Sequence, residues 1–174
     1  MIQIQKPILE FEKVGLLVPE FSLQGKECYA RVVDIYDGDT LTIILPFNDS
    51  YHRFAVRLLG IDTPEMKSKL VDNKKKAIRA RNTVMQWVLP NKIINLEEPY
   101  TRKQIQEMLA SEVSLIWVKC DIFEKYGRLM IEAFSDFQSP ASESFSKRLI
   151  REGLAYEYFG GTKLTEQDQQ QTAA

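Results

Sequence analysis

Three consecutive strand patterns in residues 28–60 constrain the fold more than any other feature of the chain. The stretches 28–36, 40–47 and 52–60 are rich in β-branched and aromatic residues. The turns between them are short, and the first contains Asp37 followed by glycine, which is a tight-turn signal. Strands joined in this way pair with their sequence neighbours. The pattern therefore predicts a meander that begins a small barrel or sandwich.

Alternation within the first strand predicts which side chains share a face. Tyr29 and Ile35 are expected on one face, and Ala30 and Val32 on the other. In the third strand the apolar alternation runs up to Gly60, which ends the strand.

The rest of the chain supplies two helices and two further strands. These are a helix over about Ala77–Val88 stopped by Pro90, strands at 113–120 and 128–134, and a helix at about 143–152 after Ser142 or Ser144. Three strands, a helix and two more strands suit a five-stranded OB-fold barrel with helices, an α+β fold.

The chain of 174 residues is long enough for one domain with a sizeable core. We expect this domain at 27–163, with an insertion at about 91–112 that contains a capped helix. An N-terminal extension, 1–26, is expected to pack on it. The tail 164–174 is polar and poor in apolar residues, so we expect it to be disordered.

The composition indicates the broad class of protein, but the net charge of −1 does not indicate its partner. With 44% hydrophobic and 27% charged residues the chain has the composition of a soluble globular protein. It shows no signal-peptide pattern and no apolar run long enough for a membrane span, which favours an intracellular location, cytoplasmic or nuclear. We also expect a monomer. The two cysteines, Cys28 and Cys120, lack zinc-site spacing and are expected to be buried free thiols, with a disulfide as the alternative.

Two acidic turns lie at strand ends of the meander. Asp39 begins the second strand, and Asp62 and Glu65 follow the third. If the strands pair in order, Asp39 and Asp62 converge, and their repulsion requires a cation. Carboxylate ligands without His or Cys select a hard ion, Ca²⁺ or Mg²⁺. The carbonyl of Thr63, which is held extended by Pro64, is available as a neutral ligand. The alternative is that both motifs are ordinary turn chemistry.

Two arginines accompany the acidic turns. Arg57 lies in an apolar strand and needs an anionic partner, and Arg128 follows a sharp turn at Gly127. Arginine binds phosphate in a bidentate manner, and an acidic metal site flanked by arginines suits phosphodiester hydrolysis. The alternatives are a structural salt bridge of Arg57 with Asp39 or Glu65, and a solvated turn residue at Arg128.

A basic stretch directly follows Glu65. Between Lys67 and Arg81 it contains seven lysines and arginines against one acidic residue, Asp72. It could lead a phosphate backbone toward the acidic turns, or it could be a solvated helix face.

Four motifs occur in the order found in a known nuclease family: DGDT at 37–40, RLLGIDTPE at 57–65, KYGR at 125–128 and KRLIREGLAYEY at 147–158. Through them the chain resembles the staphylococcal (thermo)nuclease family over roughly residues 27–163. The resemblance implies an OB-fold barrel and a single Ca²⁺ ion, or another divalent metal. It also implies hydrolysis of DNA and RNA, with single strands favoured, that leaves 3'-phosphate ends.

The same resemblance implies roles for individual residues. These are metal ligation by Asp39, Asp62 and the carbonyl of Thr63, orientation or deprotonation of water by Glu65, contact with the scissile phosphate by Arg57 and Arg128, and contact with a terminal phosphate by Lys125 and Tyr126.

Departures from the family leave two alternatives open. Phe159 stands near a position where secreted members carry a tyrosine, and their C-terminal helix is missing or very short here. Related domains in Tudor-containing scaffold proteins keep the barrel without catalysis, so a binding module is the first alternative. An OB module with a structural metal is the second. All six catalytic and metal positions hold the family's residue types, which favours the nuclease over a binding module. A structural metal would not account for Arg57 and Arg128 together.

Overall fold

The computed structural model describes residues 15, 18–165 and 168. Most of the extension predicted at 1–26, and most of the tail predicted at 164–174, lie outside the described residues. Within the described part of the extension, Leu23 is buried and the ring of Phe21 lies 5.2 Å from that of Phe47.

Five strands form a closed barrel, as the sequence predicted, and their order is β1-β2-β3-β6-β5. They are β1 (Glu27–Ile35), β2 (Thr40–Phe47), β3 (Ser50–Leu58), β5 (Leu115–Phe123) and β6 (Leu129–Phe134). Four of the strand pairs are antiparallel, and the barrel closes through a parallel pair, β3 with β6. A separate two-stranded sheet pairs β4 (Ile61–Asp62) with β7 (Tyr156–Glu157).

The face expected for Ile35 is wrong, and a β-bulge is the reason. The register of β1 with β2 shifts between Val32 and Asp34, so one extra residue reverses the alternation. Ile35 is therefore buried in the same core as Ala30 and Val32.

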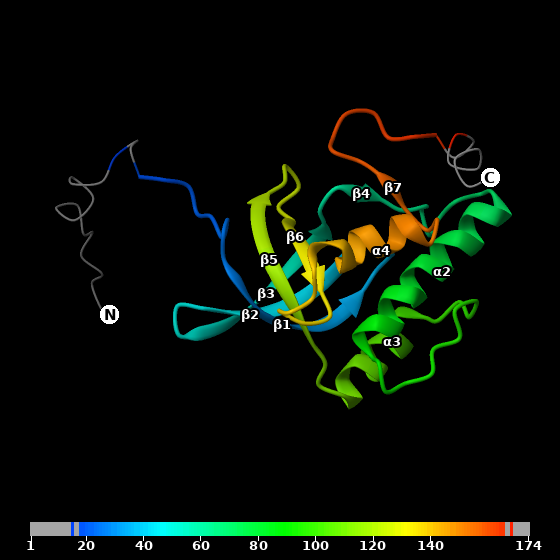
Figure 1. Cartoon of the computed structure of the whole chain (residues 1–174), viewed down its shortest axis with the longest axis horizontal. Helices are drawn as coiled ribbons and strands as arrows, with labels where there is room; N and C mark the ends of the chain where they lie inside the picture. The colour runs from blue at the N-terminus through cyan, green and yellow to red at the C-terminus, as the bar shows by residue number, and fades with distance from the viewer. Residues whose placement is uncertain (1–14, 16–17, 166–167, 169–174) are drawn as a thin grey trace, which may run out of the picture.

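The helices lie on one side of the barrel (Figure 1). They are α2 (Val71–Val88), α3 (Arg102–Ser111) and α4 (Phe145–Arg151), with a 3₁₀ turn, η1, at Ala141–Glu143. The helix predicted before Pro90 is α2, and it buries Ala77, Ala80 and Val84 against the core. The indole of Trp87 packs 5.2 Å from the ring of Phe145 and so joins α2 to α4.

The insertion at 91–112 folds onto the barrel through α3. Thr101 and Gln104 form a capping box at its first turn, and the helix contacts β1. The buried amide of Asn82 on α2 donates to the carbonyls of Asn95, Leu96 and Glu98, which fixes the loop before α3.

Cys28 and Cys120 are free thiols, as expected, but only Cys120 is buried and Cys28 is half-buried. None of the helices in the described part of the chain has the length and apolar character needed to cross a bilayer.

Candidate functional site

The two acidic turns meet at one buried guanidinium. Nη2 of Arg57 lies 2.8 Å from Oδ2 of Asp39 and also contacts Oδ1 of Asp62, and Nη1 donates to Oδ1 of Asp39 at 2.9 Å. The three side chains are 7%, 2% and 3% exposed. The convergence of the two aspartates follows from the register, in which Thr40 lies opposite Arg57. The ion pair expected as an alternative for Arg57 forms with Asp39 and Asp62 rather than Glu65.

The turn that carries Asp39 has little room around it. Oδ1 of Asp37 accepts the amides of Asp39 and Thr40 at 3.1 and 2.7 Å, which fixes the turn. A Cβ at Gly38 would lie 2.9 Å from both Cβ of Ala80 and Cγ2 of Thr63. Only glycine fits this close approach of the turn to α2 and to the second acidic loop.

The second acidic turn is held by the segment after α4. Gly60 has a φ of +77° and its carbonyl accepts the amide of Tyr158 at 2.9 Å. The strand pair β4–β7 then places Tyr156 opposite Asp62, and the Tyr156 hydroxyl donates to Oδ2 of Asp62 at 2.5 Å. The two oxygens of Asp62 thus have different partners, because Oδ2 accepts from Tyr156 and Oδ1 from Arg57.

Lys163 supplies a second cation to the acidic loop. Its Nζ lies 2.8 Å from Oδ1 of Asp62 and 3.4 Å from Oε1 of Glu65. The Glu65 side chain is 60% exposed, and within the described residues Lys163 links it to Asp62. Thr63 is buried. The Lys163 ammonium group therefore bridges Asp62 and Glu65, two carboxylates predicted to belong to the site.

Arg128 lies at the edge of the same site. Its Nε contacts Glu124, and its Nη1 lies 3.5 Å from Oγ1 of Thr40, which itself donates to Asp39 at 2.8 Å. Arg128 is thus an ion-paired residue near the site rather than a solvated turn residue.

Lys125 and Tyr126 occupy the exposed β5–β6 turn, where Gly127 has a φ of +80°. Nζ of Lys125 lies 5.0 Å from the centre of the Tyr126 ring. Among the described residues, Tyr126 forms no hydrogen bond with the carboxylates of the site. Lys125, however, lines a cavity of about 460 Å³ together with Arg57 and Phe159.

Burial and charge shift the acidity of the central groups. Burial and the charge of Asp37 raise the pKa of Asp39 well above its usual range, although Arg57 acts in the opposite direction. Burial would also raise the pKa of Asp62, but hydrogen bonds from Lys163, Tyr156 and Arg57 lower it. For both carboxylates burial favours the neutral form, and the neighbouring positive charge favours the ionised form.

The donor chemistry of the site fits a hard divalent cation. Two buried carboxylates converge on one nitrogen, and all their donor atoms are oxygens, which Ca²⁺ and Mg²⁺ prefer. Within the described residues no three His, Cys, Asp or Glu side chains form a metal-binding group. A cation here would therefore take its remaining ligands from neutral oxygens.

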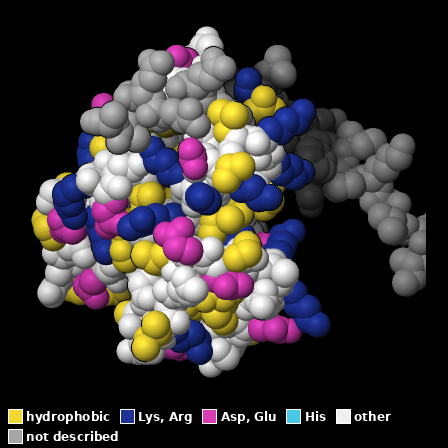
Figure 2. All heavy atoms as spheres, turned by 90° about the vertical axis from the view of Figure 1, so that its right-hand side faces the viewer, with side chains coloured by type: hydrophobic (Ala, Val, Ile, Leu, Met, Phe, Trp, Pro, Cys, Tyr) yellow, Lys and Arg dark blue, Asp and Glu magenta, His cyan; other side chains and the backbone are white. Residues whose placement is uncertain are grey.

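The basic stretch after Glu65 is not uniformly exposed. Arg81 is 6% exposed, and its Nε donates to Asn82 Oδ1 at 3.3 Å. Lys67, Lys69 and Lys74 are exposed. Figure 2 shows positive and negative side chains interspersed over the face that lies on the right-hand side of Figure 1.

Sequence reasoning missed Tyr156, Lys163 and Glu124 as contacts of the site. Tyr156 and Asp62 are 94 positions apart, and only the two-residue pairing of β4 with β7 joins them. A strand this short has no alternation for a sequence pattern to detect.

The family model described as staphylococcal nuclease homologue matches residues 55–174. The matched range contains Arg57, Asp62, Glu65 and Arg128, whereas Asp39 precedes it. No curated protein matches the chain.

Proposed function

The chain belongs to the staphylococcal nuclease homologue family, and from this membership we propose that it is a metal-dependent phosphodiesterase that hydrolyses DNA or RNA. One observation carries the proposal. A buried arginine is held between two buried carboxylates on the outer wall of an OB-like barrel. Such a group combines a phosphate-binding cation with a divalent-metal donor set at one place.

Asp39, Asp62 and the carbonyl of Thr63 would hold the metal, with Ca²⁺ as the expected ion. A divalent cation bound there neutralises phosphate charge and polarises the phosphorus centre toward attack. Because Lys163 already neutralises Asp62, it has to move away when a metal binds.

Arg57 and Arg128 would bind the non-bridging oxygens of the scissile phosphate. Arg128 lies close to Thr40, which faces Arg57 across the β2–β3 pair, so one phosphate group can contact both guanidinium groups. The two arginines stabilise the negative charge that grows on these oxygens in the transition state.

Glu65 would orient or deprotonate the attacking water. Its carboxylate is exposed, so water reaches it once Lys163 has moved. The water attacks phosphorus in line with the 5'-oxygen, its proton passes to Glu65, and the 5'-oxygen leaves and takes up a proton from the solvent. The product then carries a 3'-phosphate. Lys125 and Tyr126 would contact a terminal phosphate beside the cavity that Lys125 shares with Arg57.

Cleavage of a labelled single-stranded DNA tests the proposal. We expect cutting with millimolar Ca²⁺, none with chelator, and loss of about 10²–10⁴-fold in rate for Glu65→Gln, the range of a general base. Glu97→Gln is the matched control, because both glutamate side chains are 60% exposed and Glu97 lies outside the site. Release of a terminal phosphate from the new 3' ends by a phosphatase identifies the 3'-phosphate product.

The competing function is a nucleic-acid or protein-binding module. It is supported by Arg57 and Lys163, which neutralise Asp39 and Asp62 without a metal. Binding of the DNA without cutting, in every divalent metal tried and equally for wild type and Glu65→Gln, would establish the module and refute the nuclease.

A further inference from the structure

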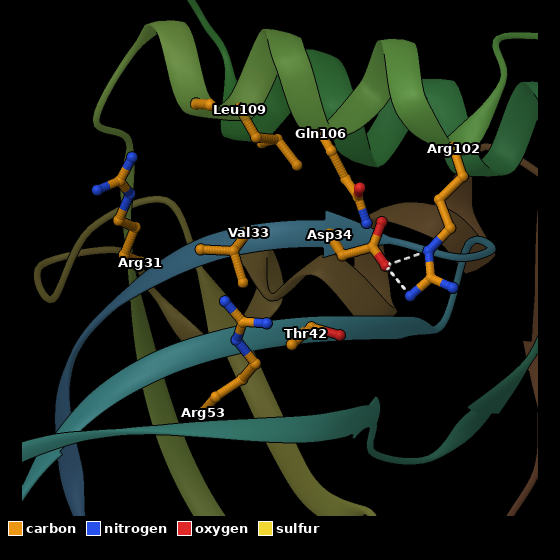
Figure 3. Close-up of a pocket in the computed structure, with 9 residues that line it drawn as sticks. Arg31, Val33, Asp34, Thr42, Arg53, Arg102, Gln106 and Leu109 are labelled. Carbon is orange, nitrogen blue, oxygen red and sulfur yellow. Dashed lines mark hydrogen bonds and ion pairs between the residues drawn. The ribbon is translucent and has the colours of Figure 1, made fainter.

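A second cavity lies on the outer wall of the barrel, beneath the inserted helix α3. Its volume is about 430 Å³, and its walls come from β1, β2, β3 and α3. In Figure 3, Arg53 extends from β3 toward the space under the helix, while Gln106 and Leu109 extend down from α3. Arg31 lies at one end of the cavity and the Asp34–Arg102 pair at the other.

The cavity has an excess of positive charge. Three arginines line it against a single acidic residue, Asp34. Asp34 is already paired, because its Oδ2 accepts from Nε and Nη2 of Arg102 at 2.7 and 2.5 Å. Among the described residues, no ion pair compensates the guanidinium charges of Arg31 and Arg53.

Two buried polar atoms of the cavity residues also lack partners. Among the described residues, neither Nε of Arg31 nor Oδ1 of Asp34 has a hydrogen-bond partner. The guanidinium of Arg53 likewise has no hydrogen bond or ion pair within the described part of the chain. Unpaired buried polar atoms are costly, so a ligand with an anion for the arginines and an N–H or O–H donor for Asp34 would be stabilised here.

The cavity and the acidic site share one surface. Arg53 and Arg57 lie four residues apart on the same strand, so their side chains point to the same outer face, about 13 Å apart along β3. The side chains between them, Ala55 on β3 and its partner Thr42 on β2, are small and uncharged. Arg31 extends this face laterally, because Ile44 pairs with both Arg31 and Arg53.

We propose that this cavity is a second phosphate-binding subsite for the nucleic-acid strand whose scissile phosphate lies on Arg57. This inference rests on the proposed function. A separation of about 13 Å corresponds to about four nucleotides of a stacked strand, at 3.4 Å for each. The phosphate binds Arg31 and Arg53, and a sugar hydroxyl or base N–H of the same nucleotide donates to Asp34.

A strand accounts for the cavity better than a small phosphorylated molecule does. The Arg53 side is exposed, and small residues connect it to Arg57 along one strand. A site built for a small molecule has no need for this connection to the acidic site.

Binding to oligonucleotides in chelator, where no cutting is expected, tests the subsite. Fluorescence anisotropy is measured with a labelled eight-nucleotide single strand at several salt concentrations, for the full chain and for Arg53→Gln and Arg31→Gln. Arg151→Gln is the control, because this exposed arginine of α4 pairs with Glu143 of η1, and neither residue lines the cavity. Unchanged thermal unfolding shows that each variant is folded.

We expect each cavity variant to lose about tenfold in affinity for the octamer, the effect of one charge-assisted hydrogen bond. The slope of log K against log salt should fall by about 0.7 for each lost contact with a single strand. The control should match wild type. If both cavity variants bind the octamer like wild type, the subsite is refuted. Loss of thymidine monophosphate binding in the variants, with unchanged octamer binding, would refute it in favour of a small-molecule site.

Failure of the subsite differs from failure of the proposed function. If wild type cuts DNA and the cavity variants bind it normally, only the subsite is wrong. If wild type neither binds nor cuts the octamer, the proposed function itself is wrong.

Discussion

Replacement of Arg57 by glutamine tests whether Asp39 and Asp62 share one indispensable positive charge. The substitution removes the only cation that contacts both carboxylates in the described structure, and all three side chains are at most 7% exposed. Removing one member of a buried ion pair costs about 3–5 kcal/mol, because the remaining charge stays buried and unpaired. Lys163 still neutralises Asp62, so we expect a loss near the lower end, about 3 kcal/mol, in the free energy of unfolding in chelator.

Calcium should return much of this stability. A ligand that binds only the folded state stabilises it by RT ln(1 + [L]/Kd), or about 2.7 kcal/mol at a hundredfold excess over Kd. In Arg57→Gln the metal replaces the missing positive charge instead of competing with it. The gain in unfolding free energy on adding Ca²⁺ should therefore be larger in the variant than in wild type.

Urea unfolding followed by the fluorescence of Trp87 and Trp117 measures both quantities. Arg151→Gln is the control, because its pair with Glu143 is 55% and 42% exposed and such surface pairs contribute about 0–1 kcal/mol. A loss below about 1 kcal/mol for Arg57→Gln, or a calcium gain equal in all three proteins, would refute the reasoning.

Three further predictions follow from other contacts. Gly38→Ala should lower the free energy of unfolding, measured in urea, by about 1–3 kcal/mol, because the added Cβ would lie 2.9 Å from that of Ala80. A change within about 0.5 kcal/mol, the range of surface substitutions, would contradict the close approach. Lys163→Gln should tighten Ca²⁺ binding, measured by calorimetry, by about fivefold. The substitution removes a half-exposed cation that lies 2.8 Å from Asp62 and 3.4 Å from Glu65. Weaker binding would contradict competition between Lys163 and the metal for Asp62. Burial raises the pKa of Cys120 to about 11, so its stabilising contribution is complete below the pKa of the unfolded thiol and is lost as pH rises toward 11. Unfolding free energy measured between pH 9 and 11 should then fall less steeply for Cys120→Ala, and parallel curves would exclude this origin.

Much of the barrel was predictable because its signals are local. Alternation over 28–60 and the helical period before Pro90 are properties of neighbouring residues, and both elements formed as predicted. The bulge in β1 was not predictable, because one extra residue in a strand leaves no mark on composition, yet it places Asp34 on the outer wall and Ile35 in the core. The parallel closure of β3 on β6 was also missed, since it joins Val56 to Leu129 across the whole helical insertion.

The contacts of the candidate site also include some that the sequence predicted and some that it could not predict. The meeting of Asp39 with Asp62 at Arg57 follows from the pairing of adjacent strands, so the motif order was enough to predict it. The contacts of Lys163 and the cavity beneath α3 depend on how segments far apart in sequence pack against one another. No periodicity or turn signal in either segment specifies that packing.

The position of Arg57 has a consequence for hydrogen exchange. Its strand is bonded on both sides, to Thr40 of β2 and Met130 of β6, so its amide can exchange only when the closed barrel opens. Lys163, in contrast, follows a strand pair of only two residues, which can separate while the barrel stays intact. Arg57 is thus carried by a strand that opens only with the whole barrel, whereas Lys163 can leave the site by local opening. Amide protection should therefore decrease by orders of magnitude from β3 to β7.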